Sequence, residues 1–300
     1  MFQSKIAEWS YSLGFISAAV DLSTGSWTTQ NVVGYPREDV KVLGVVSVWF
    51  SVLAAVAAPQ SVPSAADRSA IARARNTYYS LQRQGVRELR CNAHPDWPQI
   101  LDSMLGTNAD ARARALPYLS KTKFSVVMTE SSTDVTVERT DEQPPEGLAK
   151  LGKLVELVRV SIQQPLDDWR MFTFKPLIPE SEGDYRLEHR SGTYKITPNG
   201  GNDGQIELDE NWIIREIRTL EPVHVTISMQ PHYAKNPDGL LLSSLDERNV
   251  DEPAQQIQMT FEYLDQEGVH LPAAFGSKSQ DPGGDVSIPV KFDHYQIGRP

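Results

Sequence analysis

Apolar and polar residues alternate along three segments in the C-terminal part of the chain, at 223–229, 257–263 and 286–293. Successive side chains of a strand point to opposite faces, so this pattern predicts antiparallel strands with one apolar face and one wet face. Pro289 cannot donate to a backbone ladder, which places the last of these strands at a sheet edge or at its own start. Shorter strands, broken by Gly-rich and Asn-rich turns, are predicted over 185–220.

Helical periodicity predicts two substantial helices in the preceding part of the chain. The first covers 65–81 and is followed by Gly85 as a stop signal. The second covers 146–162, where Leu151 and Val155 belong to a broad apolar stripe. The other expected elements are a strand over 86–92, a helical region over 95–116, a hairpin-like pair over 124–138 and a loop over 235–252.

The apolar face of so long a sheet has to be buried, and two helices of adequate length are available to cover it. We therefore predict an α+β fold, in which a strongly curved antiparallel β-sheet, or half-open barrel, is covered by a few helices. The strand residues expected to share one interior, facing the helices that carry Tyr78 and Val155, are Val225, Ile227, Met259, Phe261, Ile288 and Val290.

An apolar run without charged side chains covers residues 42–58, follows Lys41 and ends in small residues that include Ala55 and Ala57. Such a run is typical of a secretory signal peptide, so we expect a periplasmic or secreted protein. A signal anchor that stays in the membrane is the alternative. However, about 17 apolar residues fall short of the roughly 20 that span a bilayer comfortably.

This run lies deeper in the chain than signal peptides normally do, and a misplaced translation start explains its position. A start at Val40 gives a short basic segment before the apolar run. The predicted organisation is a non-native extension over 1–39, a cleaved signal peptide over 40–57 and a single domain over 65–298. Cleavage is expected after Ala57 or after Ala66.

The amino-acid composition limits the classes of macromolecule that we expect as binding partners. The chain has 29 Lys and Arg against 39 Asp and Glu, a formal net charge of −10, and no basic run. Nucleic acid is therefore excluded as an expected partner, because backbone phosphates attract clustered cations. Cys91 is the single cysteine, which rules out an internal disulfide, and its strand-like setting predicts a small buried hydrophobe.

A family resemblance rests on the order of the elements and on weak patterns. The features that carry it are the leader, the helix 65–81, the strand 86–92 and the segment Gly204–Ile217 (GQIELDENWIIREI). Together they resemble the outer-membrane lipoprotein carrier superfamily of lipoprotein localisation factors. Leu271-Pro272 and the closing strand with Phe292, Tyr295 and Gly298 add to the resemblance, which identifies the chain as a divergent member.

The resemblance implies a half-open barrel with a helical lid around an apolar cavity that receives acyl chains. It also implies transport within the cell envelope and a role in sorting outer-membrane lipoproteins. The chain departs from this pattern because the regions 95–116, 146–162 and 235–252 are longer than a minimal carrier needs, and because the lid-anchoring arginine of the family matches no single residue here.

Catalytic and metal-binding motifs are absent from the sequence, so we expect no enzyme, no cofactor and no metal site. Asp167 and Asp168 are neighbours, whose side chains point in different directions, and they are expected to form a turn or a helix cap. His224 and His232 are expected to face solvent. An enzyme would become plausible if either histidine lay in a cleft beside buried carboxylates.

Two hypotheses about function remain. The first is an exported binding protein that shelters an apolar ligand, namely an acyl chain, a lipid or a lipoprotein. The second is an interaction or regulatory module of the same fold, which has a filled core, takes no ligand and contacts another envelope protein. A carrier needs more apolar inward-facing positions than the fold can fill, which leaves a cavity of several hundred cubic ångströms.

Long, adaptable and aromatic side chains near the predicted interior point to the ligand site, because such side chains suit a variable apolar partner. The residues expected to line it are Val225, Ile227, Met229, Met259, Phe261, Tyr263, Ile288, Val290 and Phe292. The residues expected at its mouth are Trp169, Met171, Phe172 and Phe174. The alternative for this set is an ordinary core with a buried strand at 171–174.

Overall fold

The computed structural model describes residues 65–105, 108–138, 151–175, 177–179, 185–190, 192–199, 204–220, 226–253, 256–280 and 286–300. The predicted extension, the signal peptide with its cleavage site after Ala57, and the residues His224 and Val225 lie outside the described residues. Among the helices within these ranges, none is both long enough and apolar enough to cross a membrane.

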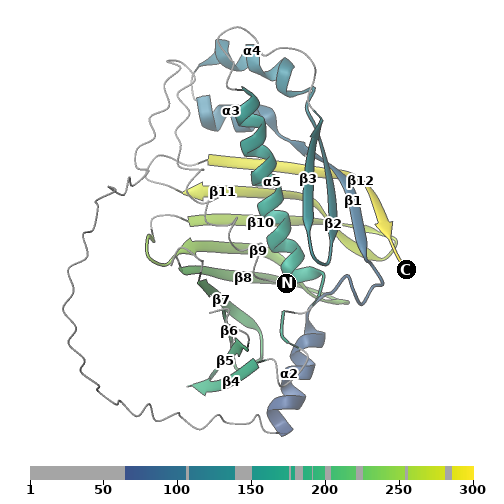
Figure 1. Cartoon of the computed structure of the whole chain (residues 1–300), viewed down its shortest axis with the longest axis vertical. Helices are drawn as coiled ribbons and strands as arrows, with labels where there is room; N and C mark the ends of the chain where they lie inside the picture. Colours follow the sequence, from purple (N-terminus) through teal and green to yellow (C-terminus); the bar gives the residue numbers. More distant parts are fainter. Residues whose placement is uncertain are drawn as a thin grey trace, which may run out of the picture.

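Twelve described strands form one antiparallel sheet (Figure 1). Their order is β3-β2-β1-β12-β11-β10-β9-β8-β7-β6-β5-β4, so β4 to β12 follow one another as neighbours and the first three strands are added beside β12. The strands are β1 Glu88–Pro95, β2 Lys123–Thr129, β3 Thr133–Glu138, β4 Tyr185–Arg190, β5 Thr193–Pro198, β6 Gln205–Leu208, β7 Ile214–Leu220, β8 Thr226–Asn236, β9 Gly239–Asn249, β10 Gln256–Gln266, β11 Val269–Gln280 and β12 Val286–Gly298.

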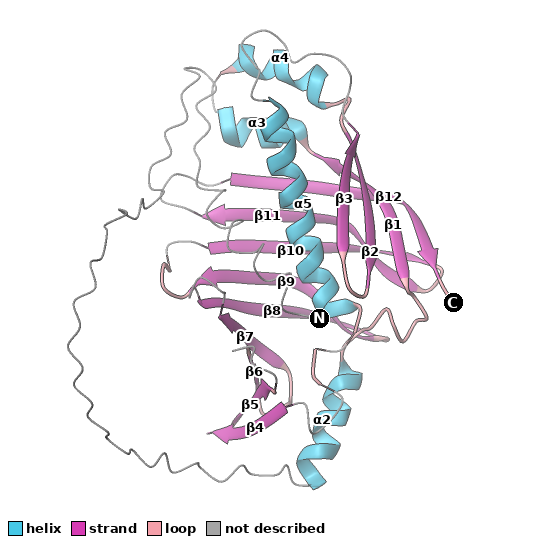
Figure 2. Cartoon of the chain, viewed as in Figure 1, coloured by secondary structure: helices cyan, strands magenta, loops and turns pink. Residues whose placement is uncertain are grey.

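The described residues contain four helices, which are α2 Ala65–Thr77, α3 Trp97–Leu105, α4 Ala109–Leu119 and α5 Leu151–Thr173. The longest, α5, crosses the long strands β8 to β12 and contacts β3, β9, β11 and β12 (Figure 2). The pair α3 and α4 packs together near β12, and α2 contacts β9. The helix α5 is therefore the element that places side chains over the middle of the sheet.

The predicted half-open barrel covered by helices is wrong. The sheet is open, with β3 and β4 as its edges at opposite ends of the strand order. The fold is mostly sheet, since four helices accompany twelve strands in the described residues. The alternation in the sequence identified which faces are apolar, but the number of strands and the position of the edges depend on pairings between distant segments, such as β1 with β12.

The predicted loop over 235–252 is also wrong, because most of it is the strand β9. The run Leu240–Leu242 followed by Ser243 and Ser244 breaks the two-residue alternation that marks the other long strands. A bulge in the pairing of β8 with β9, between His232 and Tyr233, accommodates this irregular stretch.

The phase predicted for the long strands is confirmed for the described residues. One hydrophobic core contains Ile227, Met259, Phe261, Ile288 and Val290 together with Tyr78 and Val155. On the opposite face of β10, Gln258 and Thr260 are exposed. The face of β10 that the alternation predicts to be buried is therefore the buried one, and the face that it predicts to be polar is exposed.

The segment that follows α2 crosses the β8–β9 hairpin at close range. The amide of Tyr79 donates to the carbonyl of Leu240 at 3.0 Å. Gly239 has a φ of +126°, and a Cβ there would lie 2.7 Å from the backbone nitrogen of Tyr79. This crossing explains why α2 ends at Thr77 and does not continue to Leu81 as predicted.

Candidate functional site

The residues predicted to line a ligand site gather on the sheet face that α5 covers. Seven of them belong to the same hydrophobic core as the buried residues of α5, and Tyr263 is partly buried against that core. They come from three strands: Ile227 and Met229 from β8, Met259, Phe261 and Tyr263 from β10, and Ile288, Val290 and Phe292 from β12. The structure thus brings the predicted set together.

The residues predicted at a cavity mouth lie at the C-terminal end of α5. Trp169 and Phe172 are buried within the helix, Phe174 is buried just after it, and Met171 is partly buried. The alternative of a buried strand at 171–174 is wrong, because this stretch ends a helix. Trp169 has no exposed surface, so it lies in the core and not at an opening.

A chain of hydrogen bonds joins α5 to the sheet. The indole Nε1 of Trp169 donates to the hydroxyl of Tyr263 at 2.9 Å, and that hydroxyl donates to the carbonyl of Leu242 at 2.5 Å. Burial raises the pKa of Tyr263 above its usual value. These bonds satisfy both polar groups at the contact between α5, β10 and β9.

Asp168 is the unexpected member of the site. It has no exposed surface, and neither of its carboxylate oxygens makes a hydrogen bond of normal geometry with the described residues. Desolvation raises the pKa of Asp168 well above its usual value, and the negative charges of Glu247 and Asp167 raise it further. The side chains of Gln164 and Arg170 oppose this shift, but desolvation is the larger effect.

The spacing of α5 could have located Asp168. Ser161, Pro165, Asp168 and Phe172 recur every three or four residues and are all buried, which places Asp168 on the helix face that meets the sheet. The prediction of a turn or cap at Asp167 and Asp168 is wrong, because both residues lie inside the helix.

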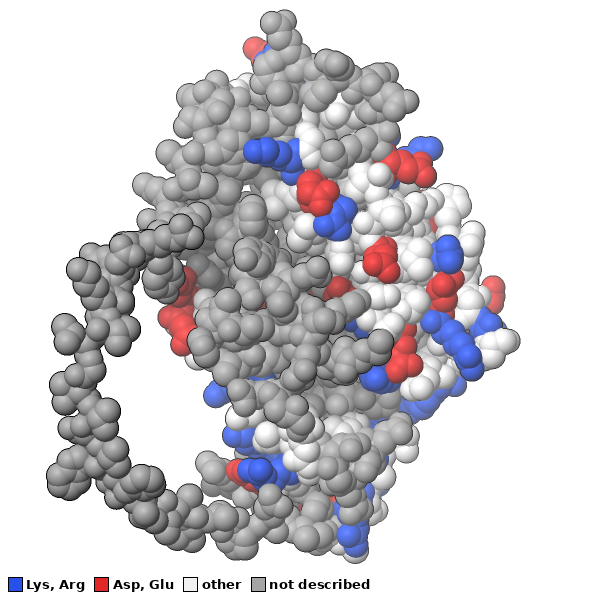
Figure 3. All heavy atoms as spheres, viewed as in Figure 1, with Lys and Arg blue, Asp and Glu red and all other residues white. Residues whose placement is uncertain are grey.

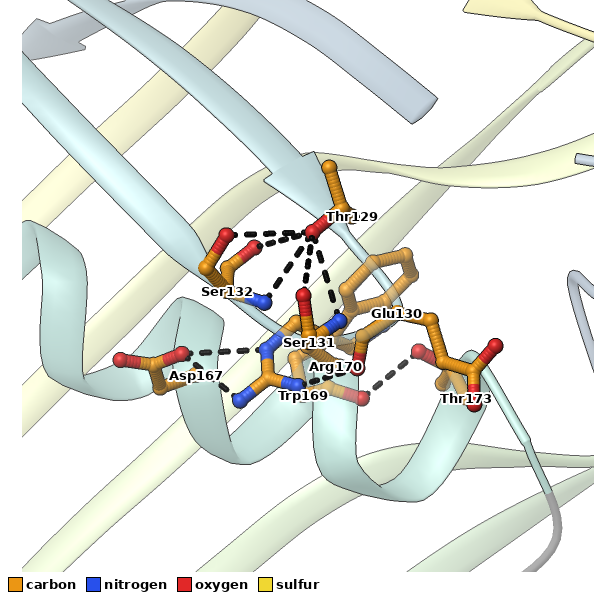
Figure 4. A network of polar contacts seen from close by, with 8 residues as sticks. All are labelled: Thr129, Glu130, Ser131, Ser132, Asp167, Trp169, Arg170 and Thr173. Atoms are coloured by element: carbon orange, nitrogen blue, oxygen red, sulfur yellow. Dashed lines mark hydrogen bonds and ion pairs between the residues drawn. The ribbon is translucent and has the colours of Figure 1, made fainter. Parts of the chain in front are cut away.

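The opposite face of the same helical turn is fastened to the β2–β3 turn (Figure 4). The guanidinium of Arg170 contacts the Asp167 carboxylate, with Nη2 at 3.0 Å, and donates from Nη1 to the backbone carbonyl of Glu130 at 2.7 Å. The Glu130 carboxylate also accepts from Lys175 at 2.9 Å. The two neighbouring aspartates therefore differ: Asp167 pairs with a cation, whereas Asp168 faces the interior.

Pro165 lies within α5, one turn before Trp169. A proline has no backbone N–H, so it cannot donate to the carbonyl of Ser161 four residues earlier, and its ring disfavours a straight helix. Backbone hydrogen bonding is therefore weaker where the last third of α5, from Pro165 to Thr173, joins the rest of the helix.

The histidines form no metal centre in the described residues. His232 is exposed, as predicted, and its Nε2 lies 3.0 Å from a carboxylate oxygen of Asp246. Within the part of the chain that the structure describes, no group of three or more His, Cys, Asp or Glu residues is arranged to hold a metal ion. Cys91 is buried as predicted, and burial raises the pKa of its thiol to about 12.

Charged side chains of both signs are interspersed on the described part of the surface drawn in Figure 3. Comparison of the chain with models of protein families, with curated proteins and with solved structures found no match.

Proposed function

We propose that this chain is an exported periplasmic binding protein that shelters an apolar ligand between α5 and the sheet face beneath it. The ligand class is an acyl chain, free or as part of a lipid or lipoprotein. Export rests on the signal-like run over 42–58. The observation that carries the proposal is the set of buried apolar side chains on β8, β10 and β12, which belong to the same core as the proline-interrupted helix α5.

Two features of α5 support a role as a movable cover. Its last third follows the weaker backbone hydrogen bonding at Pro165 and contacts the sheet through Trp169. On its outer side, Arg170 bonds to the β2–β3 turn through exposed or half-buried polar groups. Such contacts are individually worth about 1 kcal/mol or less, so they can break and re-form as a ligand enters and leaves.

An apolar chain that enters this space would take the place of buried α5 side chains such as Trp169 and Phe172. A ligand-free protein that closes over its apolar face avoids an empty void, which costs contact energy on all sides. The closed arrangement is therefore the form expected without ligand, and binding requires the last third of α5 to move.

A second candidate function is the envelope interaction module with a filled core. Met229, Met259 and Trp169 have no exposed surface, and this tight interior favours a permanent core over an exchangeable ligand space. In that case α5 is a structural element, and the protein contacts another envelope protein through its surface.

Uptake of a fluorescent acyl probe by the purified mature protein separates the two functions. We expect the wild type to bind the probe, to be competed by lipid and to gain thermal stability, since a ligand of the folded state raises the melting temperature. Extraction of the protein purified from the envelope, followed by mass spectrometry, should recover a lipid.

The matched variants are Met259→Trp on the covered face and Gln258→Trp on the exposed face of the same strand. Met259→Trp should fill the ligand space and abolish uptake, whereas Gln258→Trp should leave it intact. If the wild type takes up no apolar probe and carries no lipid, the binding function is wrong and the interaction module takes its place.

A further inference from the structure

We propose that Asp168 and Glu247 form the polar end of the ligand space and bind a cationic head group, the ammonium of an amine that carries an apolar chain. This inference rests on the proposed binding function and adds the ligand's charge and head-group chemistry to it. It concerns a pair of acidic residues on two different elements, one on α5 and one on β9.

Both side chains are buried, and they belong to two elements that contact each other, α5 and β9. Asp168 lies on the sheet-facing side of α5 and has no exposed surface, and Glu247 is only 3% exposed. Glu247 pairs in register with Met229 on β8 and with Ile257 on β10. Both of these neighbours are buried apolar residues, so the acidic pair is bordered by the surface assigned to the ligand's chain.

No cation of the described residues neutralises Asp168. Arg170 is the cation closest to Asp168 in sequence. Its guanidinium forms an ion pair with Asp167 and donates to the carbonyl of Glu130, on the outer side of the helix. Neither oxygen of Asp168 makes a hydrogen bond of normal geometry with the described residues, and the nearby side chain of Gln164 only partly opposes the rise of its pKa. A buried acceptor without a donor costs about 1–3 kcal/mol, and more when it is charged. A natural site that accepts this cost is expected to receive its donor from outside the chain.

The chemistry of the pair favours an ammonium over other donors. An ammonium carries three N–H donors and one positive charge, which satisfies carboxylate oxygens and relieves the repulsion between them. Ser279 offers a further acceptor: its buried Oγ makes no hydrogen bond, and Ile257 pairs with both Glu247 and Ser279. Two carboxylates are too few for calcium, which takes six to eight oxygen ligands.

Binding should release a proton. Desolvation and the charge of Glu247 raise the pKa of Asp168 well above its usual value, which favours the protonated carboxyl in the ligand-free protein. When the ammonium arrives with its own three protons, the carboxyl proton leaves to solvent and the ion pair remains. In total, a neutral carboxylic acid and an ammonium cation are converted into an ion pair, and one proton passes to the solvent.

The test compares two probes with the same apolar chain, decylamine and decanol, by titration calorimetry on the purified mature protein. We expect wild type to bind the amine at least about tenfold more tightly than the alcohol, which corresponds to about 1.4 kcal/mol. The heat of amine binding should differ between phosphate and HEPES buffers, because the released proton is taken up by buffers with different ionisation heats.

Asp168→Asn keeps the shape of the side chain and removes its charge, and Glu247→Gln does the same on β9. Each should abolish the amine preference and the proton release, while decanol still binds. Asp167→Asn is the control, because it removes the neighbouring carboxylate on the outer side of α5. This control should keep the preference.

The outcomes separate this inference from the proposed function. If decanol and decylamine bind equally to wild type, or if the amine preference survives in both Asp168→Asn and Glu247→Gln, the acidic pair is not a head-group site although the apolar site stands. If neither probe binds, the binding function itself is wrong.

Discussion

The long strands β8 to β12 and the short strands β4 to β7 belong to one sheet but are held in different ways. The long strands have 11 to 13 residues and lie under α5. The short strands have 4 to 7 residues and lie beyond the end of that helix (Figure 1). Their comparison indicates which part of the molecule the proposed binding function requires to move.

The short strands depend on local contacts. At the turn between β6 and β7, the carboxylate of Asp209 accepts from the amides of Asn211 and Ile213, both at 2.9 Å. Next to it, Trp212 has a positive φ of 62° and stacks on Tyr194 with a ring separation of 3.9 Å. Short-range bonds of this kind fix the geometry of the turn.

The long strands depend on contacts between distant segments. Trp169 meets Tyr263 across 94 positions of sequence, and the core beneath α5 combines residues from α5, β8, β10 and β12. A region stabilised by one covering helix loses many contacts together if that helix moves. If the protein binds a ligand as proposed, the comparison predicts that α5 moves and that β4 to β7 stay in place.

The largest expected effect is on the core beneath α5. Phe261→Ala should lower the free energy of unfolding by about 3–5 kcal/mol, because it removes a buried aromatic side chain and leaves a cavity. Urea denaturation followed by circular dichroism measures this loss. A loss below about 1 kcal/mol would mean that Phe261 is not packed in the core, so that the phase of β10 is wrong.

Replacement of the buried acid should have the opposite sign. Asp168→Asn should raise the free energy of unfolding at neutral pH by about 1–3 kcal/mol, because an amide does not ionise in the unfolded chain and so avoids the desolvation that raises the pKa of Asp168. The pKa of Asp168 is raised in the folded protein. Asp168 therefore does not destabilise the fold below its unfolded-state pKa of about 3.9, and it lowers the free energy of unfolding increasingly as the pH rises from there through its folded-state pKa.

The stabilising effect of Asp168→Asn should therefore increase as the pH rises from about 4 to neutrality. Urea denaturation at several pH values measures this dependence, with Asp167→Asn as the control. That control should be neutral or slightly destabilising, because it breaks a partly exposed ion pair. A pH-independent effect of Asp168→Asn would contradict the burial of a titrating acid under α5.

The bond between α5 and β10 should have a smaller effect. Trp169→Phe should cost about 1 kcal/mol, because it removes the hydrogen bond to Tyr263 while that hydroxyl still bonds to Leu242. Tyr263→Phe removes the same bond, so the double variant should cost less than the sum of the two single variants. Strict additivity of the two costs would show that the two side chains do not interact.

The smallest effect is expected in the short strands. Tyr194→Leu should cost about 0.5–1 kcal/mol, since it removes the ring stacked between His189 and Trp212 but keeps an apolar side chain. It should leave acyl-probe binding unchanged. Weaker probe binding in this variant would contradict the difference expected between β4 to β7 and the long strands, as would a loss of stability equal to that of Phe261→Ala.

The same contrast explains what the sequence could predict. Strict alternation located β10 and β12 and the buried side of each, because their side chains follow a single period. The strand β9 was missed, since its leucine run and paired serines follow no single period. The open edges of the sheet depend on strand pairings that no local pattern contains.

The candidate site was predictable in part. Aromatic and methionine residues gave its apolar wall, which the fold gathers under α5. Asp168 was missed because neighbouring acids usually mark a turn, whereas here the buried helical stripe runs through one of them. Glu247 was missed with the strand that carries it.

Backbone hydrogen exchange of α5 with and without a saturating acyl probe tests whether the ligand enters beneath this helix. If the ligand enters by displacing the last third of α5, the amides of residues 166–173 should exchange faster in the complex, and those of β4 to β7 should be unchanged. Bound probe with unchanged exchange in residues 166–173 would contradict the account, because the apolar chain would then lie elsewhere.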